Sequence, residues 1–174
     1  PDEKIVTIFG GAKCPPDAPE YKDARELGGR LAEAGFTICT GGYLGIMEAA
    51  SRGAHEAGGH VVGVTVAAWV DNTANAWVTE ERATPNLVAR LHELMAADAA
   101  IAVGGGMGTL AEVALAWNLR QKAPRHPGPL ILVGPQWERV IPHLADHLVI
   151  DPHEIDIAHL VPDPEAAMDV LPRA

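Results

Sequence analysis

The residues of this sequence best suited to chemistry lie in one glycine-rich run, Gly104-Gly105-Gly106-Met107-Gly108-Thr109. The run follows a wholly apolar segment and precedes a segment with helical apolar spacing. Glycine lets the backbone approach a ligand closely and adopts positive φ values at little cost. Free N–H groups at a helix start attract anions, and a threonine hydroxyl adds one more donor. The run therefore predicts a phosphate site formed by Gly105, Gly106, Met107, Gly108 and Thr109.

Two more glycine turns follow predicted strands: GGAK comes after residues 4–9, and GGYLG comes after residues 36–40. Ligands of parallel α/β sheets bind beyond the carboxyl ends of the strands, so we expect the turns to converge on one site. Any one of these turns is explained equally well by a tight strand-to-helix connection, but three converging turns favour a shared binding site. The predicted phosphate or nucleotide site therefore also includes Gly10, Gly11, Lys13, Gly41, Gly42 and Gly45.

The glycine turns differ from two well-known nucleotide-binding patterns. No GxGxxG sequence follows the first strand, and GGGMGT lacks the lysine of the P-loop. The sequence therefore supports neither NAD binding nor P-loop NTPase activity. We expect a small phosphorylated ligand, a nucleotide in particular, and no resident cofactor.

Glu112 lies one helical turn after Thr109, so its carboxylate can share a helix face with the phosphate site. It is the only charged residue between Met107 and Trp117. A carboxylate in apolar surroundings needs a partner or a function, and this one is suited to act as an acid, a base or an acceptor for a ribose hydroxyl. Compensation of the helix dipole, or burial against a partner helix, would also explain it.

The charge balance limits the possible partners. The chain carries 13 basic and 23 acidic residues, for a net charge of −10. Because an acidic surface repels phosphodiester backbones, we expect no binding of long nucleic acid. Backbone N–H groups can hold a small phosphate without any basic patch.

Sequence features also indicate the compartment. No stretch approaches the roughly 20 consecutive apolar residues that a membrane helix needs. The sequence PDEKIVTIFGG has none of the features of a secretory signal, and Cys14 and Cys39 form no CxxC pair. We therefore expect a cytoplasmic protein with no membrane contact.

The pattern of apolar segments predicts an α/β fold. Strands are expected at residues 4–9, 36–40, 60–66, 99–103, 129–133 and 157–161, and helices at residues 20–34, 46–58, 87–97, 110–121, 137–148 and from 164 onward. Alternation of continuous apolar strands with helices indicates a doubly wound, mostly parallel sheet. The prediction is a single Rossmann-like domain over residues 1–174 with three α/β/α layers.

Residues 67–86 break this regularity. The segment has no sustained period and is rich in turn formers, so we expect a long irregular excursion near the ligand that acts as a lid or specificity loop. Trp69 and Trp77 in this loop are candidates for stacking on a base, whereas Trp117 and Trp137 are assigned to the core or an interface.

Together these motifs resemble a known family. GGGMGTLAE is similar to the PGGxGTxxE motif of Lonely Guy-type proteins, and TGGYLGIMEAASRGAHEAGGHVVGV resembles their GGGxxGLMG segment with the strand that follows. The resemblance covers roughly residues 4–133, with Gly104 in place of the proline. Members are often labelled lysine decarboxylases, although the plant-type enzymes cleave the N-glycosidic bond of cytokinin riboside monophosphates or AMP to give a base and ribose 5-phosphate.

The decarboxylase label does not fit the lysines of this chain. That reaction needs a lysine that carries pyridoxal phosphate in a formed site. None of the lysines lies within a glycine turn that could hold the cofactor phosphate, although one follows the first turn closely; they are Lys4, Lys13, Lys22 and Lys122.

The resemblance also implies a catalytic pair. The family pairs the motif glutamate with an arginine on the preceding helix, which implies Glu112 and Arg90, with Arg82 as a second candidate. Arg90 is about one residue out of the family register. If catalysis occurs, Glu112 would stabilise the ribose cation or orient water, and Arg90 would hold phosphate or a ribose hydroxyl. The alternative is a non-catalytic nucleotide sensor or carrier.

Other motifs favour simpler interpretations. The sequence HEAGGH at residues 55–60 is not HExxH, and His143 with His147 lacks a third ligand, so we predict no metal site. The helix after GGGMGT is apolar through VALAW, which suits burial against a sheet or self-association. Because the related family is commonly dimeric through this region, we expect a homodimer or higher homo-oligomer.

Overall fold

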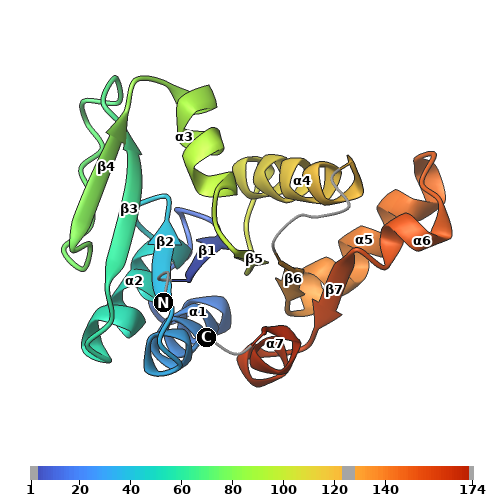
Figure 1. Ribbon diagram of the computed structural model, residues 1–174, viewed down its shortest axis with the longest axis horizontal. Helices are drawn as coiled ribbons and strands as arrows, with labels where there is room; N and C mark the ends of the chain where they lie inside the picture. Colours follow the sequence, from blue (N-terminus) through green and yellow to red (C-terminus); the bar gives the residue numbers. More distant parts are fainter. Residues whose placement is uncertain (1–3, 123–127, 173–174) are drawn as a thin grey trace.

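The structure is a computed structural model that describes residues 4–122 and 128–172. These residues form one sheet of seven strands with helices between them (Figure 1). The strands are β1 (Ile5–Phe9), β2 (Thr37–Thr40), β3 (Val61–Val66), β4 (Glu80–Thr84), β5 (Ala99–Ala102), β6 (Leu130–Val133) and β7 (Ala158–Val161). The helices are α1 (Pro19–Glu33), α2 (Ile46–Glu56), α3 (Leu87–Met95), α4 (Met107–Lys122), α5 (Pro135–His147), α6 (Pro152–Ile155) and α7 (Pro164–Val170).

The strand order is β4-β3-β2-β1-β5-β6-β7, and every neighbouring pair is parallel. The predicted doubly wound α/β/α fold is therefore confirmed. The direction of winding reverses beside β1, because β2 pairs with one edge of β1 and β5 with the other. Ligands of such sheets bind at this point of reversal, beyond the carboxyl ends of the strands.

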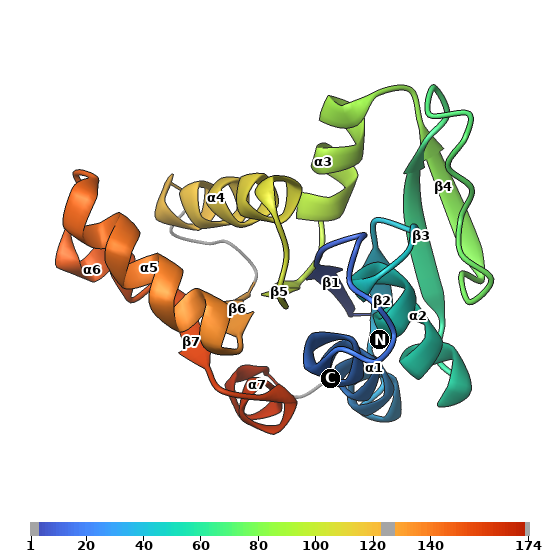
Figure 2. The same ribbon diagram turned by 180° about the vertical axis from the view of Figure 1, so that it is seen from behind.

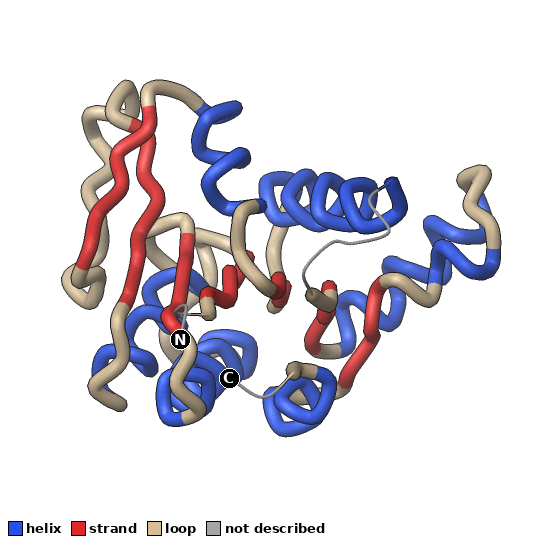
Figure 3. The backbone as a smooth tube through the Cα atoms, in the orientation of Figure 1, coloured by secondary structure: helices blue, strands red, loops and turns tan. Residues whose placement is uncertain are grey.

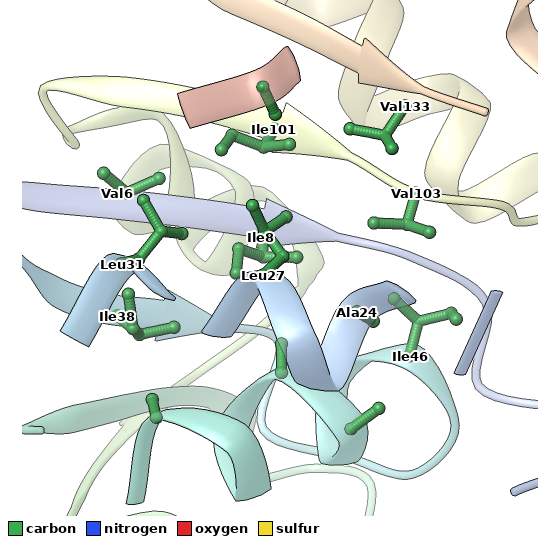
Figure 4. Close-up of a cluster of buried hydrophobic side chains, with 14 of the residues drawn as sticks. Val6, Ile8, Ala24, Leu27, Leu31, Ile38, Ile46, Ile101, Val103 and Val133 are labelled. Carbon is green, nitrogen blue, oxygen red and sulfur yellow. The ribbon is translucent and has the colours of Figure 1, made fainter. Parts of the chain in front are cut away.

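Two hydrophobic cores cover the two faces of the sheet. Alternate residues of β1 point to opposite faces, so Val6 and Ile8 join one core and Phe9 joins the other. Helices α1, α2 and α7 pack on the first face and α3, α4 and α5 on the second (Figure 2). Figure 4 shows Leu27 and Leu31 of α1 lying against the β1 side chains of the first core.

The segment predicted to be irregular contains a strand. β4 lies side by side with β3 at the edge of the sheet, with Val62 opposite Glu80 and Val66 opposite Thr84 (Figure 3). Its sequence EERAT lacks the apolar alternation that marks a half-buried strand, as is common for edge strands protected by charge. The irregular part of the excursion is therefore shorter than predicted, at residues 67–79.

The remaining differences from prediction are small. Helix α6 was not predicted, because a four-residue helix cannot show a helical period. Helix α4 begins at Met107 rather than at residue 110, so the second half of the glycine run is itself the first helical turn. Within the described residues no helix is both long and apolar enough to cross a bilayer.

Candidate functional site

A cavity of about 620 Å³ lies beyond the carboxyl ends of β1 and β5. Most of the glycine residues predicted for the site line this cavity, together with side chains from five helices and from the loops after β1, β2 and β3. The lining residues that the sequence predicted are Gly10, Gly11, Lys13, Trp69, Arg90, Gly105, Gly106, Gly108, Thr109 and Glu112. The structure thus brings residues from widely separated segments to one place.

The first and third glycine turns contact each other through their backbones. The Gly11 amide donates to the Gly104 carbonyl at 3.0 Å, and a Cβ on Gly11 would lie 3.2 Å from the Gly105 Cα. The second turn meets the first in turn, because the Ile46 amide donates to the Gly11 carbonyl at 3.0 Å. A side chain at Gly45 would overlap that carbonyl at 2.2 Å. These contacts require glycine for packing as well as for ligand access.

The second glycine turn lies behind the cavity wall. None of Gly41, Gly42 and Gly45 lines the cavity, although Tyr43 and Met47 from the same segment do. Gly42 and Gly45 have positive φ values of 78° and 67°, so they shape the entry into α2.

The start of α4 forms one side of the cavity. The first helical N–H groups of Met107, Gly108 and Thr109 have no carbonyl one turn earlier within the helix to bind. Thr109 is buried, and its side chain turns back against the turn, since a Cβ on Gly105 would meet Thr109 Oγ1 at 2.1 Å. The Met107 side chain is 79% exposed and lies outside the cavity lining, so this residue can contribute only its backbone.

Arg90 is held by backbone carbonyls and aromatic rings. Its Nε donates to the Val64 carbonyl at 2.8 Å, and its Nη2 donates to the Gly41 carbonyl at 3.0 Å. The guanidinium carbon lies 5.4 Å from the centre of the Tyr43 ring and 5.7 Å from that of Trp69. The buried guanidinium is therefore fixed in orientation, with Nη1 left to face Glu112.

Glu112 is buried opposite this guanidinium. Its Oε1 lies 3.7 Å from Arg90 Nη1, and its side chain is 12% exposed. Burial raises the pKa of the Glu112 carboxyl to about 7, while the positive charge of Arg90 lowers it in part. Near neutral pH the carboxyl is thus present in both protonated and ionised forms, as a group that transfers protons requires.

The two tryptophans of the 67–79 loop have different places. Trp69 lines the cavity, and its ring centre lies 5.8 Å from that of Tyr43. Trp77 is outside the cavity lining and packs on α2, where Arg52 lies 5.2 Å from the ring centre and His55 meets it edge-on. Only Trp69 is placed to meet a ligand in the cavity.

The loop is anchored to the second glycine turn by the buried Asn75. Its amide and its Nδ2 both donate to the Gly42 carbonyl, and Nδ2 also donates to the Tyr43 carbonyl at 2.8 Å. The Tyr43 hydroxyl accepts from the Val66 amide at 2.9 Å. This network fixes Tyr43 in the cavity wall and ties the loop to Gly42, the residue next to Gly41, whose carbonyl accepts from Arg90.

The structure also adds lining residues that were not among the predicted site residues. They are Ala12, Cys14, Glu20, Tyr43, Met47, Gly104 and Gln136. Gln136 follows a buried strand that ends at the same sheet edge, and this position was the available signal for it. Arg82, the second candidate for the arginine, donates to exposed Glu80 on β4 and is absent from the lining.

Of the predicted core or interface tryptophans, Trp137 is buried in the second core. The Trp117 Nε1 donates to the Glu154 carbonyl at 2.7 Å. Among the described residues, one group of three could present metal ligands together, namely Asp151, His153 and Glu154. None of these three lines the cavity.

The chain is similar in sequence to a known protein family and to a plant enzyme. Residues 3–123 match the model of the SLOG cluster4 family. The chain is 38% identical over 114 residues to the cytokinin riboside 5′-monophosphate phosphoribohydrolase LOG of Oryza sativa subsp. japonica, covering 63% of this chain and 46% of that enzyme. The chain thus spans less than half the length of this relative.

Two solved structures match over nearly the full chain. The molybdenum cofactor binding protein of Rippkaea orientalis is 28% identical with a TM-score of 0.77, covering 96% of this chain and 94% of that one. The molybdenum cofactor carrier protein of Chlamydomonas is 29% identical with a TM-score of 0.75, covering 97% and 95%. The proteins that this chain resembles are thus named for different activities, one for a phosphoribohydrolase and two for binding or carrying the molybdenum cofactor.

Proposed function

We propose that this chain, which belongs to the SLOG cluster4 family of Lonely Guy type, binds a nucleoside 5′-monophosphate and hydrolyses its N-glycosidic bond. Water adds across the bond, so hydroxide joins the anomeric carbon and a proton joins the departing base, giving ribose 5-phosphate and free base. The observation that carries the proposal is the buried Glu112–Arg90 pair beside the start of α4 in one cavity.

The spacing along α4 supports this arrangement. Glu112 lies five residues beyond Met107, which is about 7.5 Å along a helix at 1.5 Å per residue. That length is comparable to the separation of a 5′-phosphate and the anomeric carbon of the same ribose. A phosphate on the N–H groups of the first helical turn would therefore bring the reacting carbon near the carboxyl.

The electrostatics support proton transfer and charge stabilisation by Glu112. Cleavage develops positive charge on the ribose, and an ionised carboxylate that is itself buried stabilises it more strongly than water does. The pKa of about 7 also lets the protonated form donate to the departing base. Arg90 keeps part of the population ionised and presents Nη1 toward the carboxylate and a ribose hydroxyl.

The test is to incubate the protein with AMP and related monophosphates and follow free base by chromatography. We expect base release that falls by about 100-fold or more in Glu112→Gln, which keeps the shape but removes the titrating group. Glu138→Gln, an exposed change on α5, is the matched control. No release of base from any monophosphate, or undiminished release in Glu112→Gln, would rule the reaction out.

A second candidate function is binding or transport of a phosphorylated ligand without hydrolysis. The observation that favours it is the match over more than nine tenths of both chains to the molybdenum cofactor proteins, against less than half of the plant hydrolase. Calorimetry followed by recovery of the ligand separates the two, since a carrier returns it intact at a stoichiometry of about one. Elemental analysis of the purified protein for molybdenum tests that cargo directly.

We further propose that two copies associate through α3 and α4. Leu87, Val88 and Met107 are exposed on these helices, and the exposed Ala111 and Ala114 extend the apolar surface along α4. Apolar surface shared by adjacent helices is typical of an interface. Light scattering should give twice the monomer mass, with a shift to monomer in Val88→Glu; a monomeric wild-type protein contradicts the pairing.

We also propose that this protein lies in the cytoplasm, where both cysteines would remain free thiols.

A further inference from the structure

Gln136 in the first turn of α5 holds both backbone polar groups of Gly105. The Gly105 amide donates to Gln136 Oε1 at 3.0 Å, and Gln136 Nε2 donates to the Gly105 carbonyl at 2.8 Å. A single side chain therefore fixes the two consecutive peptide planes on either side of Gly105. Both residues line the cavity, so the contact lies in the wall of the proposed site.

The direction of these bonds has a consequence for the next amide. In a planar trans peptide the C=O and N–H groups point in opposite directions. Because the Gly105 carbonyl points at Gln136, the Gly106 N–H in the same peptide plane points away from α5. Gly106 lines the cavity, and no atom lies within 4 Å of a Cβ built on it. The open space beside Gly106 is available to a ligand.

We propose that Gln136 is a positioning residue that aims the Gly106 N–H at the phosphate of the ligand, while its own bond occupies the Gly105 N–H. The inference rests on the proposed phosphate site. It assigns the anion to the amides from Gly106 to Thr109, without Gly105, and it makes α5 part of the phosphate site although α5 contributes no basic residue to the cavity.

Gly104 leaves room for this side chain. A Cβ at position 104 would lie 3.2 Å from Gln136 Oε1 and 3.1 Å from Glu20 Cγ, tighter than ordinary contacts. The related motif has proline at this position, and the Cβ of that proline would press on the carboxamide. The glycine at 104 and the glutamine at 136 therefore belong to one arrangement.

The experiment measures binding of AMP, ribose 5-phosphate, inorganic phosphate and adenosine by calorimetry to wild-type protein and Gln136→Ala. We expect the Kd of AMP and of ribose 5-phosphate to rise about tenfold in the variant, and the Kd of adenosine to stay within about twofold, because adenosine has no phosphate. Gln121→Ala, which removes a glutamine bonded to Glu154 at the far end of α4, is the matched control. Hydrogen exchange without ligand should show faster exchange of the Gly105 amide in Gln136→Ala.

A double-mutant cycle gives a second readout. Gly104→Ala should weaken AMP binding by displacing the carboxamide, and the double variant should bind no more weakly than Gln136→Ala alone. Additive losses, equal losses for AMP and adenosine, or unchanged AMP affinity in Gln136→Ala would each overturn the proposal. If wild-type protein binds AMP but releases no base, the hydrolase function fails and the Gln136 result still stands. If it binds no phosphate compound, both fail.

Discussion

The second and third glycine turns look alike in sequence and do different work in the fold. GGGMGT follows β5 and presents backbone to the cavity, whereas GGYLG follows β2 and lies behind the wall, where the Gly41 carbonyl accepts from Arg90. A Cβ on Gly41 would lie 1.9 Å from Arg90 Nη2, and a Cβ on Gly106 would meet nothing within 4 Å. Gly106 thus leaves open space on the cavity side, whereas Gly41 leaves room for the Arg90 side chain.

Of the substitutions in the two turns, Gly41→Ala should have the largest effect. The added methyl must displace the buried Arg90, so we expect base release to fall by about 100-fold or more and the free energy of unfolding to fall by about 2 kcal/mol. Gly29→Ala, where the new Cβ would be 3.5 Å from the Gly53 carbonyl oxygen, is the matched control with little expected change. Chemical denaturation and AMP turnover measure both effects. Full activity in Gly41→Ala would mean that Arg90 is not needed where it lies.

Arg90→Lys tests the arginine without loss of charge. A lysine cannot donate to two carbonyls and still face Glu112, because it lacks the planar fork of the guanidinium. We expect the kcat for AMP to fall by about 30- to 100-fold with a smaller change in KM, since binding of phosphate is assigned to α4. A change in KM alone would instead place Arg90 at the phosphate.

Gly106→Ala tests the ligand-facing turn. The fold has room for the methyl group, so we expect the free energy of unfolding to change by less than about 0.5 kcal/mol. The methyl occupies the ligand side, so the Kd of AMP should rise about tenfold while that of adenosine changes less. Destabilisation similar to that of Gly41→Ala would show that the two turns do not differ.

The pH dependence of stability tests the raised pKa of the Glu112 carboxyl, which lies beside Arg90. In the folded protein the pKa of Glu112 is raised from 4.5 to about 7, so folding favours its protonated form. The free energy of unfolding of the wild type should therefore fall, relative to Glu112→Gln, by up to about 1.4 kcal/mol per pH unit as the pH rises from 4.5 to 7. The difference should be constant above that range. Urea unfolding at pH 5 and pH 8 measures it, and an equal gap at both values contradicts the raised pKa.

Trp77→Ala should have the smallest effect on function. Trp77 packs on Arg52 and His55 outside the cavity, so we expect a loss of stability of about 1 kcal/mol and an unchanged Kd for AMP. Trp69→Ala, in the same loop but in the cavity wall, should raise that Kd about tenfold. Equal effects of the two changes would mean that the loop acts on the ligand as a whole.

The fold was largely predictable because its signals are local. Buried parallel strands are continuous apolar runs, and six of them were predicted within about two residues of their observed bounds. β4 escaped prediction because an edge strand needs no apolar pattern, and its polar sequence EERAT gives no sign of its pairing with β3. Family membership was also readable from the sequence, since the glycine motifs are short and ordered along the chain.

The sequence by itself determined six strands of the sheet, the three glycine turns at one edge and the carboxylate one turn into α4. Only the tertiary structure decided which of the glycine turns presents its backbone to the cavity. Glycine has no side chain, so the sequence does not show whether a glycine faces a ligand or packs against another residue. The same holds for the one-residue shift of Arg90 in sequence: its long side chain still reaches Glu112 at 3.7 Å, held by carbonyls of β3 and the β2 turn. Gln136 likewise acquires its role only when α5 is packed beside Gly105.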